Sequence, residues 1–122
     1  MRTVLLVDDS PVARRVVTQR LVAEGYEVVE AASVAAARKM DVALLGCAIV
    51  DLELPDGDGT DLARFLAEKR PSLPIAFFTQ GTAPSLIEGA RGRGSVFLKP
   101  DLNPLIAWVK RAVRTSQPPP TK

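Results

Sequence analysis

Five polar residues of this sequence follow or end short apolar runs, and their side chains could do chemistry together. Asp8 and Asp9 follow the first run, and Asp51 ends a later one. Thr79 and Lys99 end two more. Three carboxylates, a hydroxyl and an ammonium group in one place could hold a hard cation and neutralise the charge of a transferred phosphoryl group.

The strands and helices that carry these residues can be predicted from the apolar patterns. The apolar runs are continuous rather than alternating, as expected for strands buried on both faces. Between them lie segments with helical periodicity. The predicted strands are 3–7, 27–30, 47–51, 75–79 and 95–99, and the predicted helices are 11–24, 34–45, 60–69, about 84–91 and 102–114. This alternation predicts the α/β class: a doubly wound, five-stranded parallel sheet with helices on both faces.

In such a sheet, ligands bind beyond the carboxyl ends of the strands, so the five polar residues are expected to converge there. Clustered carboxylates repel one another unless a pKa rises or a cation is held. Mg²⁺ suits oxygen ligands of this kind, with Lys99 opposite them and Thr79 as a hydroxyl donor. Any one of these residues alone could be a helix cap, a surface lysine or a strand residue. Together they favour phosphoryl transfer to a carboxylate.

The first predicted helix has clear signals at both ends. Ser10 is its expected N-cap, Pro11 its first residue and Gly25 its end. Arg14 and Arg15 are expected on its polar side. The apolar side is expected to comprise Val12, Val16, Val17, Leu21 and Val22.

Composition excludes several classes of protein. With 122 residues and 47% apolar content, the chain fits one domain with one core. Cys47 is the sole cysteine and histidine is absent, which excludes a disulfide framework, the usual zinc sites and Cys-His or Ser-His catalysis within the chain. Cys47 is expected to be a small buried strand residue, and Trp108 a packed or partly exposed residue of the last helix.

Charge and hydropathy argue against nucleic-acid and membrane partners. Sixteen basic and fourteen acidic residues give a net charge of +2, and the arginines are dispersed without interleaved aromatic residues. We therefore expect no direct nucleic-acid contact by this domain. No apolar run approaches the roughly 18 residues needed to span a bilayer, and no signal peptide is evident, so we expect cytoplasmic residence.

Four motifs resemble those of response-regulator receiver domains, over residues 2 to about 114. They are Val-Leu-Leu-Val-Asp8-Asp9-Ser-Pro, Ile-Val-Asp51-Leu-Glu-Leu-Pro-Asp-Gly-Asp-Gly, Phe-Phe-Thr79 and Phe-Leu-Lys99-Pro100. The resemblance implies a flavodoxin-like (βα)5 fold with strand order 2-1-3-4-5. It also implies a switch in two-component signalling that catalyses only its own aspartyl phosphorylation and dephosphorylation.

The resemblance also implies a role for each site residue. Asp51 would accept a phosphoryl group from a phosphohistidine on a histidine kinase or phosphotransfer protein. Asp8, Asp9, Asp51 and the main-chain carbonyl of Glu53 would bind Mg²⁺, with Asp8 acting directly or through water. Lys99 would pair with the phosphoryl oxygens, and Thr79 would hydrogen-bond one of them. The Lys99–Pro100 peptide is expected to be cis.

The sequence departs from the family pattern on the side that transmits the signal. Val96 stands three residues before Lys99, where the family has an aromatic residue, and Phe97 should point to the other face of its strand. Gln80 replaces the usual small residue after Thr79. The fourth helix is expected to be short or mobile because the segment from Gly81 to Gly94 carries Pro84 and the glycines Gly89, Gly92 and Gly94.

Two alternative functions are compatible with parts of this sequence. Asp56-Gly-Asp58-Gly-Thr60 matches the D-x-D-x-T pattern of haloacid-dehalogenase-type phosphatases, but that pattern must directly follow an apolar strand and here it does not. We therefore interpret it as a polar turn. The stronger alternative is an atypical receiver that binds partners without phosphorylation. Val96 favours that alternative, whereas the complete set of polar residues favours phosphorylation.

The predicted domain covers residues 1–114, followed by a Pro-rich tail or the start of a linker at 115–122. The output protein or fused output domain is not identifiable from these residues. The sequence also leaves open a weak homodimer through the last two helices.

Overall fold

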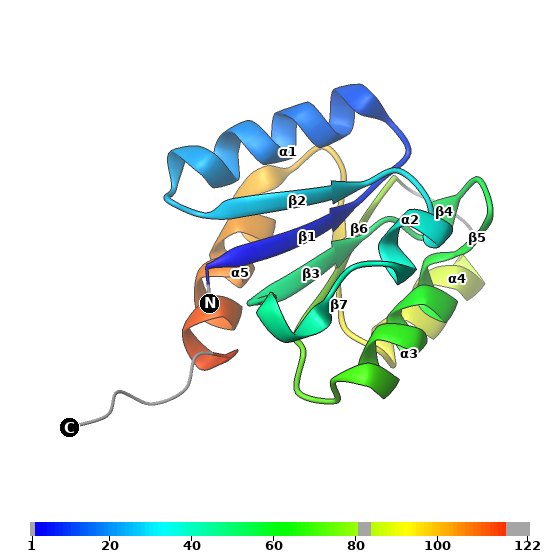
Figure 1. Ribbon diagram of the computed structural model, residues 1–122. Helices are drawn as coiled ribbons and strands as arrows, with labels where there is room; N and C mark the ends of the chain where they lie inside the picture. Colours follow the sequence, from blue (N-terminus) through cyan, green and yellow to red (C-terminus); the bar gives the residue numbers. More distant parts are fainter. Residues whose placement is uncertain (1, 81–83, 117–122) are drawn as a thin grey trace.

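The computed structural model describes residues 2–80 and 84–116 of the chain, which form a parallel sheet between two layers of helices (Figure 1). Five strands pair in the order β2-β1-β3-β6-β7, and every pairing is parallel. Because β4 and β5 form a separate hairpin, this order equals the predicted 2-1-3-4-5, and the predicted fold class is confirmed. The strands are β1 (Thr3–Val7), β2 (Glu27–Ala31), β3 (Cys47–Val50), β6 (Ile75–Thr79) and β7 (Ser95–Leu98).

Two apolar cores flank the sheet, one on each face. The helices α2 (Val34–Arg38), α3 (Gly59–Lys69) and α4 (Pro84–Arg91) contribute to the first core, which includes Phe77 and Leu66. The helices α1 (Pro11–Ala23) and α5 (Leu102–Ser116) contribute to the second, which includes Leu21 and Ile106. The strands β1 and β3 supply residues to both cores, which explains their continuous apolar runs.

The ends of α1 agree with the predicted signals. The Ser10 side chain accepts a hydrogen bond from the Ala13 amide, and Pro11 opens the helix. Glu24 is the C-cap, and Gly25 follows it with φ of +94°, a conformation that favours glycine.

The predicted apolar side of α1 is wrong for three of its five residues. Val17 and Leu21 are buried, but Val12 is 74% exposed, and Val16 and Val22 are also exposed. Only one narrow row of α1 meets the sheet. Val12 and Val16 instead line an open apolar groove of about 270 Å³.

The second helix is much shorter than predicted. It ends at Arg38 instead of continuing to residue 45, and a separate 3₁₀ turn, η1 (Val42–Leu44), follows. Asp41 causes the break because its side chain caps η1 by accepting a hydrogen bond from the Ala43 amide.

A two-stranded hairpin lies where a polar turn was predicted, with β4 (Glu53–Leu54) antiparallel to β5 (Gly57–Asp58). Asp58 caps α3, and the Asp56 carboxylate accepts hydrogen bonds from the Val34 and Ala35 amides at the start of α2. The two aspartates of the D-x-D-x-T pattern thus act as helix caps.

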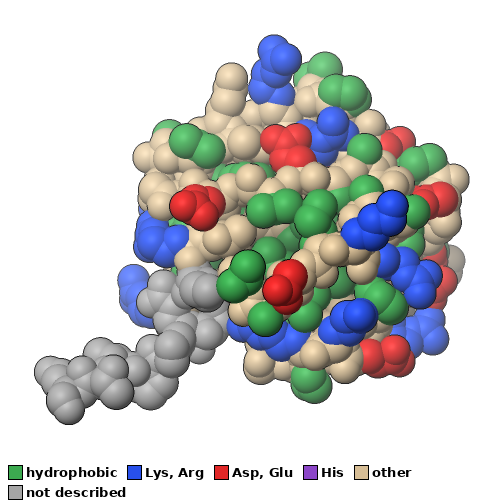
Figure 2. Space-filling view, viewed as in Figure 1, with side chains coloured by type: hydrophobic (Ala, Val, Ile, Leu, Met, Phe, Trp, Pro, Cys, Tyr) green, Lys and Arg blue, Asp and Glu red, His purple; other side chains and the backbone are tan. Residues whose placement is uncertain are grey.

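The last helix extends two residues beyond the predicted Arg114, to Ser116, so Thr115 does not end it. The rest of the predicted tail, 117–122, lies outside the described residues. In the described part of the chain, no helix has the length and apolar character needed to cross a bilayer. Basic and acidic side chains are interspersed on the face that Figure 2 shows.

Candidate functional site

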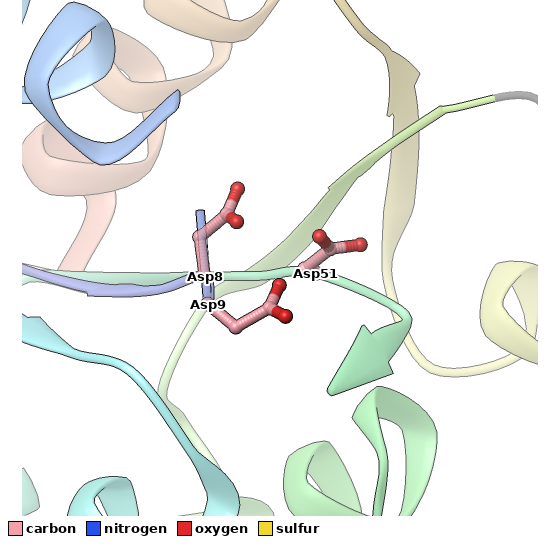
Figure 3. A group of neighbouring side chains, drawn as sticks. All are labelled: Asp8, Asp9 and Asp51. Carbon is pink, nitrogen blue, oxygen red and sulfur yellow. The ribbon is translucent and has the colours of Figure 1, made fainter. Parts of the chain in front are cut away.

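Three carboxylates gather where β1 and β3 end (Figure 3). One ligand atom from each of Asp8, Asp9 and Asp51 lies within 4.8 Å of the other two. Asp8 and Asp51 are buried, whereas Asp9 is exposed. The parallel pairing of β1 with β3 places Val7 opposite Val50, so the residues that follow these two leave the sheet at the same level.

Lys99 supplies the positive charge of the site. Its Nζ lies 2.7 Å from Asp8 Oδ2 and 3.0 Å from Asp51 Oδ2, and its side chain is only 12% exposed. Burial lowers the pKa of this ammonium, but hydrogen bonds and charge from Asp8 and Asp51 outweigh burial and raise the pKa overall. Lys99 is therefore a fixed cation at neutral pH.

The main chain around Lys99 holds this side chain in place. The Lys99 amide donates a 2.8 Å hydrogen bond to the Thr79 carbonyl, which joins the ends of β7 and β6. The Lys99–Pro100 peptide is cis, as predicted.

The site opens into a pocket of about 450 Å³. Ser10, Ala13 and Gln80 line part of this pocket. The rest of the lining consists of every residue that the sequence predicted for the site, namely Asp8, Asp9, Asp51, Glu53, Thr79 and Lys99. Thr79 is buried at the end of β6, and Glu53 lies two residues beyond Asp51 in β4. The tertiary structure thus brings the predicted residues together, and their chemical roles stay predictions.

The donor set of this pocket fits a hard divalent cation. The three carboxylates offer oxygen ligands, the type that Mg²⁺ prefers, and the pocket leaves space for water or a phosphoryl group. Lys99 neutralises part of the charge of Asp8 and Asp51, so a cation would meet a site with a reduced negative charge.

The packing of α3 against the Asp51 main chain is a feature that the sequence did not indicate. The Gly59 amide donates a 2.8 Å hydrogen bond to the Leu52 carbonyl. A Cβ atom on Gly59 would lie 2.2 Å from the Asp51 carbonyl oxygen, closer than any side chain tolerates. The sequence shows that a glycine follows Asp58, but only the structure shows that the missing side chain permits the close approach of α3 to the Asp51 main chain.

Arg14 is a second residue near the site that the sequence did not single out. Its Nη1 donates a 2.7 Å hydrogen bond to the main-chain carbonyl of Asp8. The polar pattern of α1 placed Arg14 with Arg15 and carried no signal that separated the two. In the structure Arg14 is half-buried and Arg15 is exposed.

The departures from the family pattern are visible in the structure. Val96 packs against the core on the α2, α3 and α4 side, and Phe97 points to the opposite face, as predicted. The Phe97 and Trp108 rings lie 6.5 Å apart. Gln80 is exposed beside the pocket.

Cys47 is buried in β3, as predicted. Burial raises the pKa of its thiol to about 12, so it is protonated at neutral pH and is a poor nucleophile.

Comparisons with known proteins agree with this geometry. The family model described as "Response regulator receiver domain" matches residues 4–105. The transcriptional regulatory protein PdtaR of Mycobacterium tuberculosis is 33% identical over 92% of this chain and 57% of its own length. The C4-dicarboxylate transport transcriptional regulatory protein DctD of Pseudomonas aeruginosa is 32% identical over 90% of this chain and 25% of its own. This chain therefore spans only part of these curated relatives.

Solved structures show the same fold. The non-phosphorylated receiver domain of HemR from Leptospira biflexa superposes with a TM-score of 0.80, at 28% identity and with full coverage of both chains. TrrA from Thermotoga maritima, solved in complex with Mg²⁺ and BeF, has a TM-score of 0.82 at 24% identity, covering 92% of this chain and 99% of its own. With its sheet order, its acidic pocket and these matches, the chain belongs to the response regulator receiver domain family.

Proposed function

We propose that Asp51 accepts a phosphoryl group from a phosphohistidine, in an Mg²⁺-dependent reaction, as the switch of a cytoplasmic phosphorelay. The donor would be a histidine kinase or a phosphotransfer protein. The observation that carries the proposal is the position of Lys99, whose ammonium bridges Asp8 and Asp51 at the edge of an open, oxygen-lined pocket. That arrangement leaves a carboxylate next to a fixed cation with space for a phosphoryl group.

The proposed reaction is a displacement at phosphorus. An oxygen of the Asp51 carboxylate attacks the phosphorus atom, a P–O bond forms, and the P–N bond to the donor imidazole breaks. The electron pair of that bond stays with the imidazole nitrogen. The product is an aspartyl phosphate on this chain.

The residues of the pocket have distinct parts in this proposal. Asp8, Asp9, Asp51 and the Glu53 carbonyl would hold Mg²⁺, which when bound offsets the charge of the phosphoryl oxygens. Lys99 gives up its contact with Asp51 and pairs with a phosphoryl oxygen, and the Thr79 hydroxyl donates to another.

Phosphorylation replaces the single charge of the Asp51 carboxylate by a phosphoryl group that carries about 1.5 to 2 negative charges at the carboxyl end of the sheet. We propose that this charge changes the surface formed by α4, β7 and α5, and that an output protein or fused domain binds there. The relatives support a regulatory output, because PdtaR and DctD are named as transcriptional regulatory proteins and are longer than this chain.

Intact-mass measurement after incubation with acetyl phosphate and Mg²⁺ tests the proposal. We expect a gain of one phosphoryl group that is stable in acid and labile in base. The gain should be absent without Mg²⁺ and in Asp51→Asn, which keeps the size of the side chain and removes the nucleophile. Glu53→Gln, which keeps the main-chain carbonyl, serves as a variant that should still be phosphorylated.

The alternative is a receiver that binds its partner without phosphorylation, and Val96 is the observation that favours it. Absence of any mass gain from acetyl phosphate and from a purified kinase, with the protein folded, would support this alternative. In that case Asp51→Asn would bind the partner as tightly as the wild type.

A further inference from the structure

A network of polar side chains outside the pocket, formed by Arg14, Glu30 and Thr18, contacts the main chain of Asp8. The guanidinium of Arg14 makes two contacts with different parts of the protein. Nη1 donates to the Asp8 carbonyl at 2.7 Å, and Nε lies 2.9 Å from Glu30 Oε1. The other Glu30 oxygen accepts a 2.8 Å hydrogen bond from the Thr18 hydroxyl.

The Asp8 carbonyl lies one residue beyond the last paired residues of β1 and β2, which are Val7 and Ala31. The Asp8 amide still reaches the Ala31 carbonyl, at 3.0 Å. Arg14 therefore holds the main chain at the point where the sheet ladder ends. The peptide unit that it holds joins Asp8 to Asp9, the two consecutive carboxylates of the site.

This peptide unit limits the positions that the Asp9 carboxylate can reach, because it sets the orientation of the Asp9 main chain. The Asp8 side chain is already fixed by Lys99 Nζ and by the Ser10 amide, which donates to Asp8 Oδ1 at 2.9 Å. Asp9 is the exposed member of the group, so its direction depends on the main chain more than on packing.

The network is built to hold Arg14 in one position. The Arg14 side chain is only 19% exposed. The hydrogen bond from Thr18 lowers the pKa of Glu30. Burial raises this pKa, but the contact with Arg14 lowers it further, so the carboxylate stays charged at neutral pH. A planar guanidinium can contact a carbonyl and a carboxylate at once, which a lysine ammonium would do with less geometric control.

We infer that Arg14, anchored by Glu30 and Thr18, is a positioning residue for the divalent cation: it holds the Asp8–Asp9 peptide so that the Asp9 carboxylate lies beside those of Asp8 and Asp51. This inference rests on the proposed Mg²⁺-dependent function. Residues that orient the ligands of a metal commonly change its affinity by 10- to 100-fold when they are replaced.

For Arg14→Gln, the lost charge and the lost positioning of the Asp8–Asp9 peptide have opposite effects on the affinity for Mg²⁺, so the measurement separates them. Removing a positive charge near three carboxylates should by itself tighten Mg²⁺ binding. Loss of positioning should weaken it. We expect a dissociation constant for Mg²⁺ about 10-fold weaker than in the wild type, measured from ¹⁵N amide shifts during a MgCl₂ titration at constant ionic strength and pH 7.

Arg15→Gln is the matched control, because Arg15 is the exposed neighbour on the same helix and loses the same charge. Its Mg²⁺ affinity should be equal to or tighter than that of the wild type. Thr18→Val is the second variant, which removes the hydroxyl that anchors Glu30 without changing any charge. We expect it to weaken Mg²⁺ binding about threefold, and it decides the matter if Arg14→Gln does not fold.

Unchanged or tighter Mg²⁺ binding by folded Arg14→Gln, or unchanged binding by Thr18→Val if the first variant is unfolded, would overturn the inference. The proposed function fails by a separate result, namely a wild-type protein that binds Mg²⁺ and is not phosphorylated. The two failures are therefore distinguishable in the same set of samples.

Discussion

The central strands β1 and β3 differ from the edge strand β7 in how far their residues are buried. Every residue of β3, and all of β1 except Thr3, is buried, and the acidic residues follow directly. At the edge, β7 has exposed ends and partly buried middle residues, with Leu98 51% exposed. The three carboxylates proposed to bind Mg²⁺ thus follow the most buried strands of the sheet, whereas Lys99 follows the partly exposed β7, which also belongs to the surface proposed to transmit the signal.

This difference also matches where the sequence departs from its family. The polar residues at the ends of β1, β3, β6 and β7 are all present, whereas Val96 in β7 and Gln80 after β6 are unusual. We therefore expect the site to tolerate changes within β7 and α4 far better than changes where α3 packs against the main chain of Asp51.

Gly59→Ala should have the largest effect on stability. Its Cβ would lie 2.2 Å from the Asp51 carbonyl oxygen, so the main chain of α3 or of Asp51 must move. We expect the free energy of unfolding to fall by about 3 kcal/mol, measured by urea denaturation.

Gly89→Ala in α4 is the control for this change, because nothing lies within 4 Å of the Cβ that it adds. It should stabilise the protein by up to about 1 kcal/mol through helix propensity. Equal destabilisation by the two alanines would contradict the proposed contrast between the two regions.

Lys99→Met should have the next largest effect, and its signature is a change in pH dependence. The variant leaves Asp8 and Asp51 without their shared cation, at a cost of about 2 kcal/mol at pH 7. The raised pKa of Lys99 means that its contribution is complete below the unfolded lysine pKa of about 10.4 and is lost as pH rises through the folded pKa.

Denaturation between pH 8 and pH 11 measures this signature. The wild type should lose more stability above pH 10.4 than Lys99→Met does. Lys110→Met is the control, because Lys110 forms an exposed ion pair with Glu24, and its loss should cost much less stability than Lys99→Met. Parallel pH profiles for wild type and Lys99→Met would count against a fixed, charged Lys99.

Val96→Tyr should have the smallest effect and tests the edge strand directly. Val96 packs against the same core as Leu86 and Ile87 of α4 and does not line the described pocket around Asp51. We expect a loss of about 1 kcal/mol from the larger side chain, and a rate of phosphorylation by acetyl phosphate within twofold of the wild type. A tenfold change in that rate would show that β7 and the site are coupled more tightly than their packing indicates.

The elements that the sequence predicted best are those with strong local signals. The helix α1 begins at Ser10 and Pro11 and ends before Gly25, as expected, and the apolar runs marked every strand of the main sheet. The second helix was predicted too long because Asp41 was not recognised as a cap inside an apolar stretch. The exposure of Val12 and Val22 could not be predicted from periodicity, since it depends on how narrow a row of α1 the sheet meets.

From the sequence alone we could predict the order of the elements, the fold class and the polar residues at the strand ends. These follow from local patterns, because each polar residue interrupts or ends an apolar run at a predictable place. Tertiary structure decided the contacts between residues far apart in the chain. Lys99 between Asp8 and Asp51, Gly59 against the Asp51 carbonyl and Arg14 on the Asp8 carbonyl all depend on the distance and angle between packed elements, which no local pattern encodes.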